Sequence, residues 1–161
     1  MRVMLDADPL ALQSWTEILL RLGIAAALGL LLGLDRELRG HDAGIRTHAL
    51  VSLSSAMIMV SSLILYAQLR SAEFAPDPLR SIQGLSQAIG FIAAGMIFVR
   101  RGNVVNMTTA ANIWIAAAIG IACGCGQYRV VAVGAALAIL LLVVVRAIER
   151  WLPGEKPERK D

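Results

Sequence analysis

Five long apolar segments limit the folds that this sequence can adopt. A helix needs roughly 20 largely apolar residues, with a range of about 17–25, to cross the hydrocarbon core of a bilayer. Five stretches reach or approach this length: residues 18–34, 47–69, 82–99, 107–125 and 130–147. The sequence therefore predicts an all-α, polytopic membrane protein with five transmembrane helices.

The composition points to the same class of protein. Hydrophobic residues make up 57% of the chain and charged residues 17%, against roughly 45–50% and about 25% in soluble domains. We predict one membrane domain at residues 18–150, after a short periplasmic segment at 1–17 and before a disordered cytoplasmic tail at 151–161. The basic residues lie at the ends of the apolar segments rather than on one face. The expected partner is therefore the lipid bilayer and not a nucleic acid.

The orientation follows from the distribution of Lys and Arg between the connections. Ten of the fifteen Lys and Arg residues fall on the side that carries the C-terminus. Because basic residues are retained on the cytoplasmic side, we expect the C-terminus in the cytoplasm and the N-terminus outside. An odd number of spans agrees with this arrangement. A bacterial inner membrane is the expected location.

Small residues recur about four positions apart within the apolar segments. In lipid, helices associate largely by close approach at such residues, because no hydrophobic driving force acts between them. Packing inside one subunit is the simpler interpretation, and a homodimer interface is the alternative. The candidate packing residues are Gly29, Gly33, Gly90, Ala94, Gly95, Gly120 and Gly124.

Charged residues mark the boundary between the first two segments. Asp35, Arg36 and Glu37 end the first segment, and Arg46-Thr47 opens the second. Two residues apart on a helix, Asp35 and Glu37 differ by about 200° around its axis, so they are not expected to form a two-carboxylate site unaided. An ion pair with a nearby arginine (Arg46, Arg100 or Arg101) is the structural interpretation. Ionisable groups at membrane depth are nevertheless candidates for function.

A second polar stretch precedes the fourth apolar segment. Thr108 and Thr109 are suited to cap a helix N-terminus, whereas Asn112 lies deeper and would need an interhelical partner. If both polar stretches converge, Asp35 and Glu37 with neighbouring oxygens could hold Mg²⁺. Arginines and helix N-termini would instead favour an anion. A cation site, an anion site and a satisfied polar network all remain open, and no other cofactor is predicted.

Motifs typical of enzymes are not found in the sequence. There is no G-x-S-x-G, Walker loop or H-E-x-x-H. His48 stands at a helix start beside Arg46 and Thr47, where a packing role is favoured over general-base chemistry. The chain is therefore not expected to be an enzyme.

Three segments resemble the membrane domain of the MgtC/SapB family. They are GLDRELRGHDAGIRTHALV at 33–51, RSIQGLSQAIGFIAAGMIF at 80–98 and VVNMTTAANIWIAAAIGIACGCGQY at 104–128. The resemblance assigns the family's acidic position to Asp35, its R-T pair to Arg46-Thr47, and part of its later motif to Thr108 and Thr109. Many members carry a cytoplasmic ACT-like domain after the last span, so this chain resembles the short form without it.

The resemblance implies a function in magnesium homeostasis. Members are associated with survival at low magnesium and, in some pathogens, inside host cells. The leading expectation is a non-enzymatic role exerted on partner membrane proteins, the ATP synthase among them. The alternative is a transporter or channel for Mg²⁺ or another ion that uses Asp35 and Asn112, and a structural or assembly role is a third hypothesis.

Overall fold

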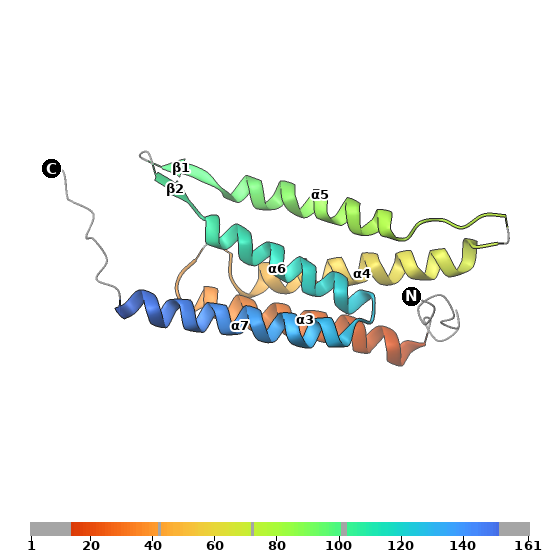
Figure 1. Cartoon of the computed structure of the whole chain (residues 1–161), viewed down its shortest axis with the longest axis horizontal. Helices are drawn as coiled ribbons and strands as arrows, with labels where there is room; N and C mark the ends of the chain where they lie inside the picture. Colours follow the sequence, from red (N-terminus) through yellow and green to blue (C-terminus); the bar gives the residue numbers. More distant parts are fainter. Residues whose placement is uncertain (1–13, 42, 72, 101–102, 152–161) are drawn as a thin grey trace.

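Five helices and one short β-hairpin form the computed structural model, which describes residues 14–41, 43–71, 73–100 and 103–151. With the labels of Figure 1, the strands β1 (Phe98–Arg100) and β2 (Asn103–Val105) pair antiparallel, with Phe98 opposite Val105. The helices are α3 (Trp15–Glu37), α4 (Ile45–Leu69), α5 (Leu79–Met96), α6 (Met107–Gly124) and α7 (Tyr128–Trp151). The predicted terminal segments lie mostly outside the described residues.

Four of the described helices are long and apolar enough to cross a membrane: α3, α4, α6 and α7. The prediction of a helical membrane protein is confirmed by these four. The remaining helix, α5, has 18 residues and carries Arg80, Gln83 and Gln87, which lower its hydropathy.

The third predicted span was wrong at its C-terminal end. Residues 98 and 99, expected to be helical, lie in β1 because α5 ends at Met96. Ile97, Val99, Val104 and Val105 surround the turn, and β-branched residues favour an extended backbone. The hairpin therefore replaces the last turn of the expected helix.

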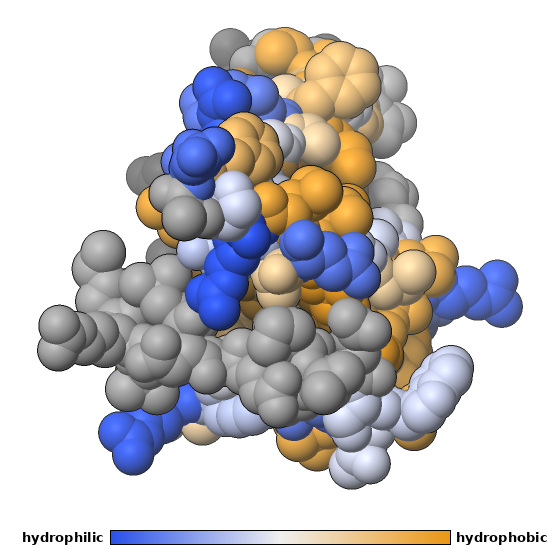
Figure 2. Space-filling view, turned by 90° about the vertical axis from the view of Figure 1, so that its right-hand side faces the viewer, coloured by the Kyte–Doolittle hydropathy of each residue, from blue (hydrophilic) through white to orange (hydrophobic). Residues whose placement is uncertain are grey.

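The helices run side by side along the long axis of the molecule (Figure 1). Helix α6 is central, since it contacts α3, α4, α5 and α7. One end of the bundle gathers the α3–α4 connection, the hairpin and the end of α7 (Figure 1). Figure 2 looks at the opposite end, where hydrophilic residues surround exposed hydrophobic ones. We call the end with the hairpin the hairpin end.

Glycines allow α3 and α4 to approach closely. A Cβ added at Gly29 would lie 2.7 Å from the carbonyl oxygen of His48, and one at Gly33 would lie 2.6 Å from the Cα of Ile45. The Ser52 hydroxyl of α4 donates a hydrogen bond of 2.8 Å to the carbonyl of Ala25, which lies one turn before Gly29 in α3. Backbone contact and this interhelical hydrogen bond join the two helices.

The other face of α4 packs on α6 in the same way. A Cβ at Gly120 would lie 2.1 Å from the carbonyl oxygen of Ser52, and one at Gly124 would lie 2.6 Å from that of Ala56. Helix α4 is thus held between two glycine-containing faces. The centre of the bundle is sealed, with Ala25, Ala56 and Ala116 fully buried.

The small residues of α5 are placed differently. A Cβ at Gly90 would lie 3.7 Å from the Trp114 ring, which is ordinary contact, and a Cβ at Gly95 would meet nothing within 4 Å. Ala94 is exposed. Ala94 and Gly95 therefore face away from the interhelical contacts of this chain.

Candidate functional site

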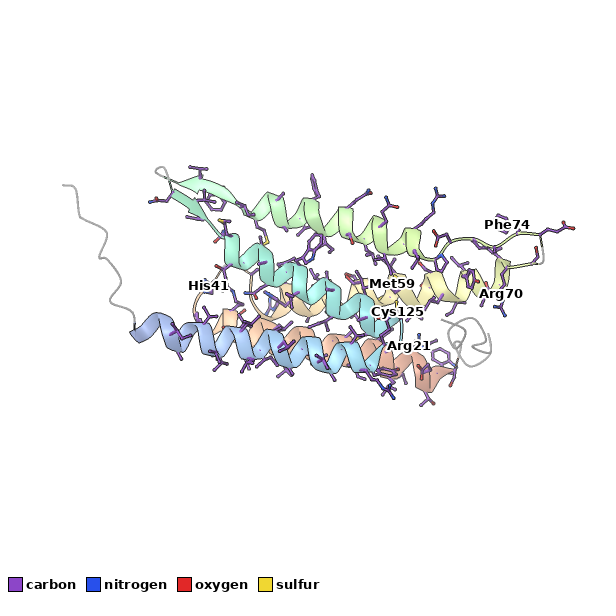
Figure 3. All side chains as sticks on the ribbon, in the orientation of Figure 1. Arg21, His41, Met59, Arg70, Phe74 and Cys125 are labelled. Carbon is purple, nitrogen blue, oxygen red and sulfur yellow. The ribbon has the colours of Figure 1, made fainter. Side chains whose placement is uncertain are left out.

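A cavity of about 510 Å³ opens at the hairpin end, between the end of α3, the start of α6 and the second half of α7. Its polar wall comes from α3, the following connection and α6, and its apolar wall comes from α6 and α7. The polar residues are Asp35, Arg36, Arg39, His41, Asn106, Thr108, Thr109 and Asn112; the apolar ones are Ile115, Ala138, Leu141, Leu142 and Val145. His41 lies at this end of the bundle, far from Arg21 (Figure 3).

Arg36 is the most deeply buried charge in this wall. The residue is only 5% exposed, and its Nη2 donates a hydrogen bond to the Thr109 hydroxyl, which joins α3 to α6. Its Nε has no hydrogen-bond partner among the described residues. The guanidinium is therefore held in place but incompletely satisfied.

Asp35 forms its ion pair with Arg39, one turn further along the same stretch of chain. Sequence reasoning had considered Arg46, Arg100 and Arg101 instead. Arg46 is exposed and does not line the cavity, while the side chains of Arg100 and Arg101 lie outside the described residues. Arg39 stands four residues after Asp35, the spacing of neighbours on one helix face, and this spacing would have identified it as the partner of Asp35.

Glu37 belongs to a different local structure. Its carboxylate accepts a hydrogen bond of 3.1 Å from the backbone N–H of Ile45, the first residue of α4. This contact requires a glycine at position 44, since a Cβ there would lie 1.6 Å from Glu37 Oε2. Glu37 therefore caps α4, and a carboxylate at a helix N-terminus also complements the helix dipole.

The predicted polar cluster thus divides in two. Asp35, Arg36, Thr108, Thr109 and Asn112 line the same cavity. The other three members do not line it: Glu37 ends α3 and contacts the start of α4, where Arg46 and Thr47 lie.

Two side chains near the cluster each have a buried nitrogen without a hydrogen-bond partner among the described residues. The Asn112 amide nitrogen is buried without a partner, although the sequence predicted an interhelical one. His48 is fully buried, with Nδ1 2.9 Å from the carbonyl oxygen of Gly44 and Nε2 without a partner. That geometry suits the neutral tautomer with its proton on Nδ1, and complete burial makes His48 unsuitable as a general base.

The cavity is richer in hydrogen-bond donors than in metal ligands. Among the described residues, no group of three or more His, Cys, Asp or Glu side chains could hold a metal ion. Asp35 and Glu37, the two carboxylates considered for Mg²⁺, are directed to Arg39 and to Ile45 respectively. A site for Mg²⁺ would need several oxygen ligands or retained waters around one point.

Sequence reasoning missed a second polar cluster at the opposite end of the bundle. The Nε of Arg21 lies 2.7 Å from Glu17 Oε1, and its Nη1 donates to the Gly124 carbonyl at 2.8 Å. The Tyr128 hydroxyl donates to the same Glu17 oxygen at 3.0 Å. These contacts join the start of α3 to the α6–α7 turn.

Burial also raises the pKa of the neighbouring Cys125 thiol, so this cysteine is protonated at neutral pH.

Comparison with known proteins identifies the family of the chain. The sequence model of the MgtC family matches residues 22–151, which cover most of α3, all of α4, α6 and α7, and the polar cavity. The chain belongs to the MgtC family. The resemblance seen in the sequence motifs is therefore confirmed.

Several curated MgtC relatives are similar over most of the chain. The "Putative magnesium transporter YhiD" of Escherichia coli strain K12 is 40% identical over 129 residues, 80% of this chain and 60% of YhiD. Protein SapB of Bacillus subtilis is 36% identical, over 83% of this chain and 58% of SapB. Protein MgtC of Salmonella typhimurium is 38% identical, over 69% of this chain and 45% of MgtC. The chain thus spans about half to three fifths of these relatives, and no solved structure matches it.

Proposed function

We propose that this chain is a five-span inner-membrane protein that supports adaptation to low magnesium by binding another membrane protein, without catalysing a reaction. The observation that carries the proposal is a sealed bundle with an unpaired helix face on α5. Membership of the MgtC family and the magnesium-related name of a relative support the link to magnesium.

Helix α5 is proposed as the fifth span, with the N-terminus outside and the hairpin end in the cytoplasm. Its 18 residues extend about 27 Å at 1.5 Å per residue, close to the roughly 30 Å of a bilayer core. It lies alongside α6, which is itself a candidate span (Figure 1). A helix that packs along a spanning helix is positioned to cross the same membrane.

One face of α5 is available to a partner. The helix buries only Leu85 and Ile89, and a stripe at intervals of three and four residues remains exposed on another face: Gly84, Ala88, Phe91 and Gly95. We call these four residues the α5 stripe. Phe91 is 82% exposed. Small residues beside an aromatic one form a surface on which a second transmembrane helix can pack closely.

The sealed centre of the bundle favours binding over transport. The polar cavity reaches Ile115, halfway along α6. Beyond it, Ala116, Cys123 and Ala25 are fully buried. A continuous polar path along the bundle would have to displace these side chains.

Substitution of the α5 stripe tests the proposal. Gly84→Leu and Gly95→Leu add side chains where a Cβ meets nothing within 4 Å, so the fold should be retained. We expect both variants to lose low-magnesium growth in a bacterium that depends on this protein, and to lose co-purification with the ATP synthase, the partner that the family resemblance suggests. Gly134→Leu on α7 is the matched control, because Gly134 is equally open.

The outcome also separates a partner protein from a second copy of the chain. If the stripe variants change only the homo-oligomeric mass in detergent and retain ATP synthase binding, the α5 stripe is a homodimer interface. Normal growth and unchanged binding in both variants would refute a role for α5.

Ion transport is a second candidate, because Asp35 and Asn112 line the same cavity. It predicts Mg²⁺ uptake into liposomes that contain the purified protein, reduced by Asp35→Asn. Absence of uptake from folded protein would leave the binding role as the better account.

A further inference from the structure

Arg36 carries a buried positive charge, and the carboxylate nearest to it along the chain, that of Asp35, is paired with another arginine, Arg39. Arg21 forms an ion pair with Glu17, and Arg39 forms one with Asp35. Arg36 donates to the neutral hydroxyl of Thr109, and its Nε has no partner. A buried charge is costly when it lacks a counter-charge. An anionic ligand in the adjoining cavity would supply one.

Two further donors surround the same cavity. The buried amide nitrogen of Asn112 has no partner. Helix α6 begins after Asn106, whose side chain makes no capping hydrogen bond to the helix N-terminus. The first backbone N–H groups of a helix have no partner within the helix, and the helix dipole favours negative charge there. All three features favour an acceptor-rich, negatively charged group.

The remaining charges in the wall do not reverse this preference. The lining residues include two arginines, Arg36 and Arg39, and one carboxylate, Asp35, which is paired with Arg39. His41 adds a group that becomes positive on protonation. The wall therefore has an excess of positive charge over negative charge.

The cavity changes from polar to apolar along the bundle. Its polar residues lie near the C-terminal end of α3 and the N-terminal end of α6. The part that lies deeper in the bundle is lined by Ile115, Ala138, Leu141 and Leu142. A phospholipid has this order of polarity, with its phosphate at the interface and its chains in the membrane. Basic pockets between spanning helices on the cytoplasmic side are suited to anionic headgroups. A free phosphate ion would gain nothing from the apolar wall.

We propose that this cavity binds an anionic phospholipid, with the headgroup phosphate at Arg36, Asn112 and the start of α6, and an acyl chain along α7. The volume of about 510 Å³ lies within the roughly 300–1,000 Å³ of small-molecule sites. The site is separate from the α5 stripe and does not depend on the proposed binding partner. It gives Arg36 a counter-charge in the assembled membrane.

Lipid binding to the purified, delipidated full chain tests the proposal. Thermal unfolding and native mass spectrometry would be followed with added phosphatidylglycerol, with zwitterionic phosphatidylcholine, and with inorganic phosphate alone. We expect phosphatidylglycerol to bind more tightly and to raise the unfolding temperature. Arg36→Gln should weaken its binding about tenfold to a hundredfold, as expected for the loss of a hydrogen bond to a charged group. Arg36→Lys should restore part of the affinity.

Two variants keep the test decisive. Asn112→Leu removes a buried donor that has no partner, so the protein should fold while lipid binding falls severalfold. Arg46→Gln removes an exposed arginine at the same end, outside the cavity, and should bind lipid normally. If phosphatidylglycerol has no advantage over phosphatidylcholine, or if the Arg36 and Asn112 variants behave like Arg46→Gln, the site is refuted. If inorganic phosphate alone reproduces the stabilisation, the ligand is a free anion and the lipid assignment is wrong.

Discussion

Arg21 illustrates how a single charged residue is accommodated within an apolar helix. Its side chain is 11% exposed and lies beside Glu17 of the same helix, and its Nη1 donates to the backbone of α6. The carbonyl of Gly124 belongs to the last residue of α6, where the helix has no further N–H groups to satisfy it. A cation at a helix C-terminus also complements the helix dipole.

We predict that Arg21→Met destabilises the folded protein. The change leaves the Gly124 carbonyl and the Glu17 carboxylate without this donor, which should cost about 1.5–3 kcal/mol. Tyr128→Phe removes only the hydroxyl that donates to Glu17 and should cost about 1 kcal/mol. Thermal unfolding in detergent would measure both. Arg129→Gln, an exposed arginine at the same end, should change little, and an equal effect of all three would contradict the assigned contacts.

Individual residues were predictable from the sequence to different degrees. The position of Asp35, Arg36 and Thr109 at helix ends followed from the pattern of apolar segments, and the structure brings them to one cavity. The partner of Arg21 was overlooked, although Glu17 stands four residues before it, the spacing of neighbours on one helix face. The contact with Gly124 could not be predicted, because it depends on where α6 ends against α3.

At the scale of the elements, glycine spacing sets how closely helices pack. Gly29 and Gly33 meet the backbone of α4, and Gly120 and Gly124 meet its other face. The same spacing in α5 places Gly84 and Gly95 on an exposed face. The sequence therefore predicts close-packing faces without revealing whether a face is covered within the chain.

We predict opposite effects for two glycines of α3. Gly29→Ala would place a Cβ 2.7 Å from backbone atoms of α4, and overpacking of this kind typically costs about 1–3 kcal/mol. Gly23→Ala meets nothing within 4 Å and should stabilise the helix by about 0.5–1 kcal/mol. Unfolding temperatures of the two variants in one detergent would test this. A loss of stability from Gly23→Ala equal to that from Gly29→Ala would show that α3 does not pack through Gly29.

For the whole molecule, the alternation of the predicted spans placed the two polar stretches on the same side of the membrane and left open whether they converge. With alternating helices, the end of the first segment and the start of the fourth fall on the same side, and both line the cavity at the hairpin end. The apolar wall from α7 was not predicted, because a uniformly apolar helix gives no signal of which face it turns to its neighbours. The hairpin was also missed, since its short strands continue the apolar pattern of α5.

The position of α5 can be decided by the accessibility of introduced cysteines. Phe74 lies in the α4–α5 connection and is 59% exposed, and Asn103 is exposed in β2. In a chain with Cys123→Ala and Cys125→Ala, Phe74→Cys should react with a membrane-impermeant thiol reagent in intact spheroplasts. Asn103→Cys should react only after the membrane is permeabilised, because a fifth span places it in the cytoplasm. Arg46→Cys, at the end of α4 for which we propose a cytoplasmic position, is the control and should behave as Asn103→Cys does. If Phe74→Cys and Asn103→Cys react from the same side, α5 does not cross the bilayer, and the α5 stripe would meet a partner at the membrane surface.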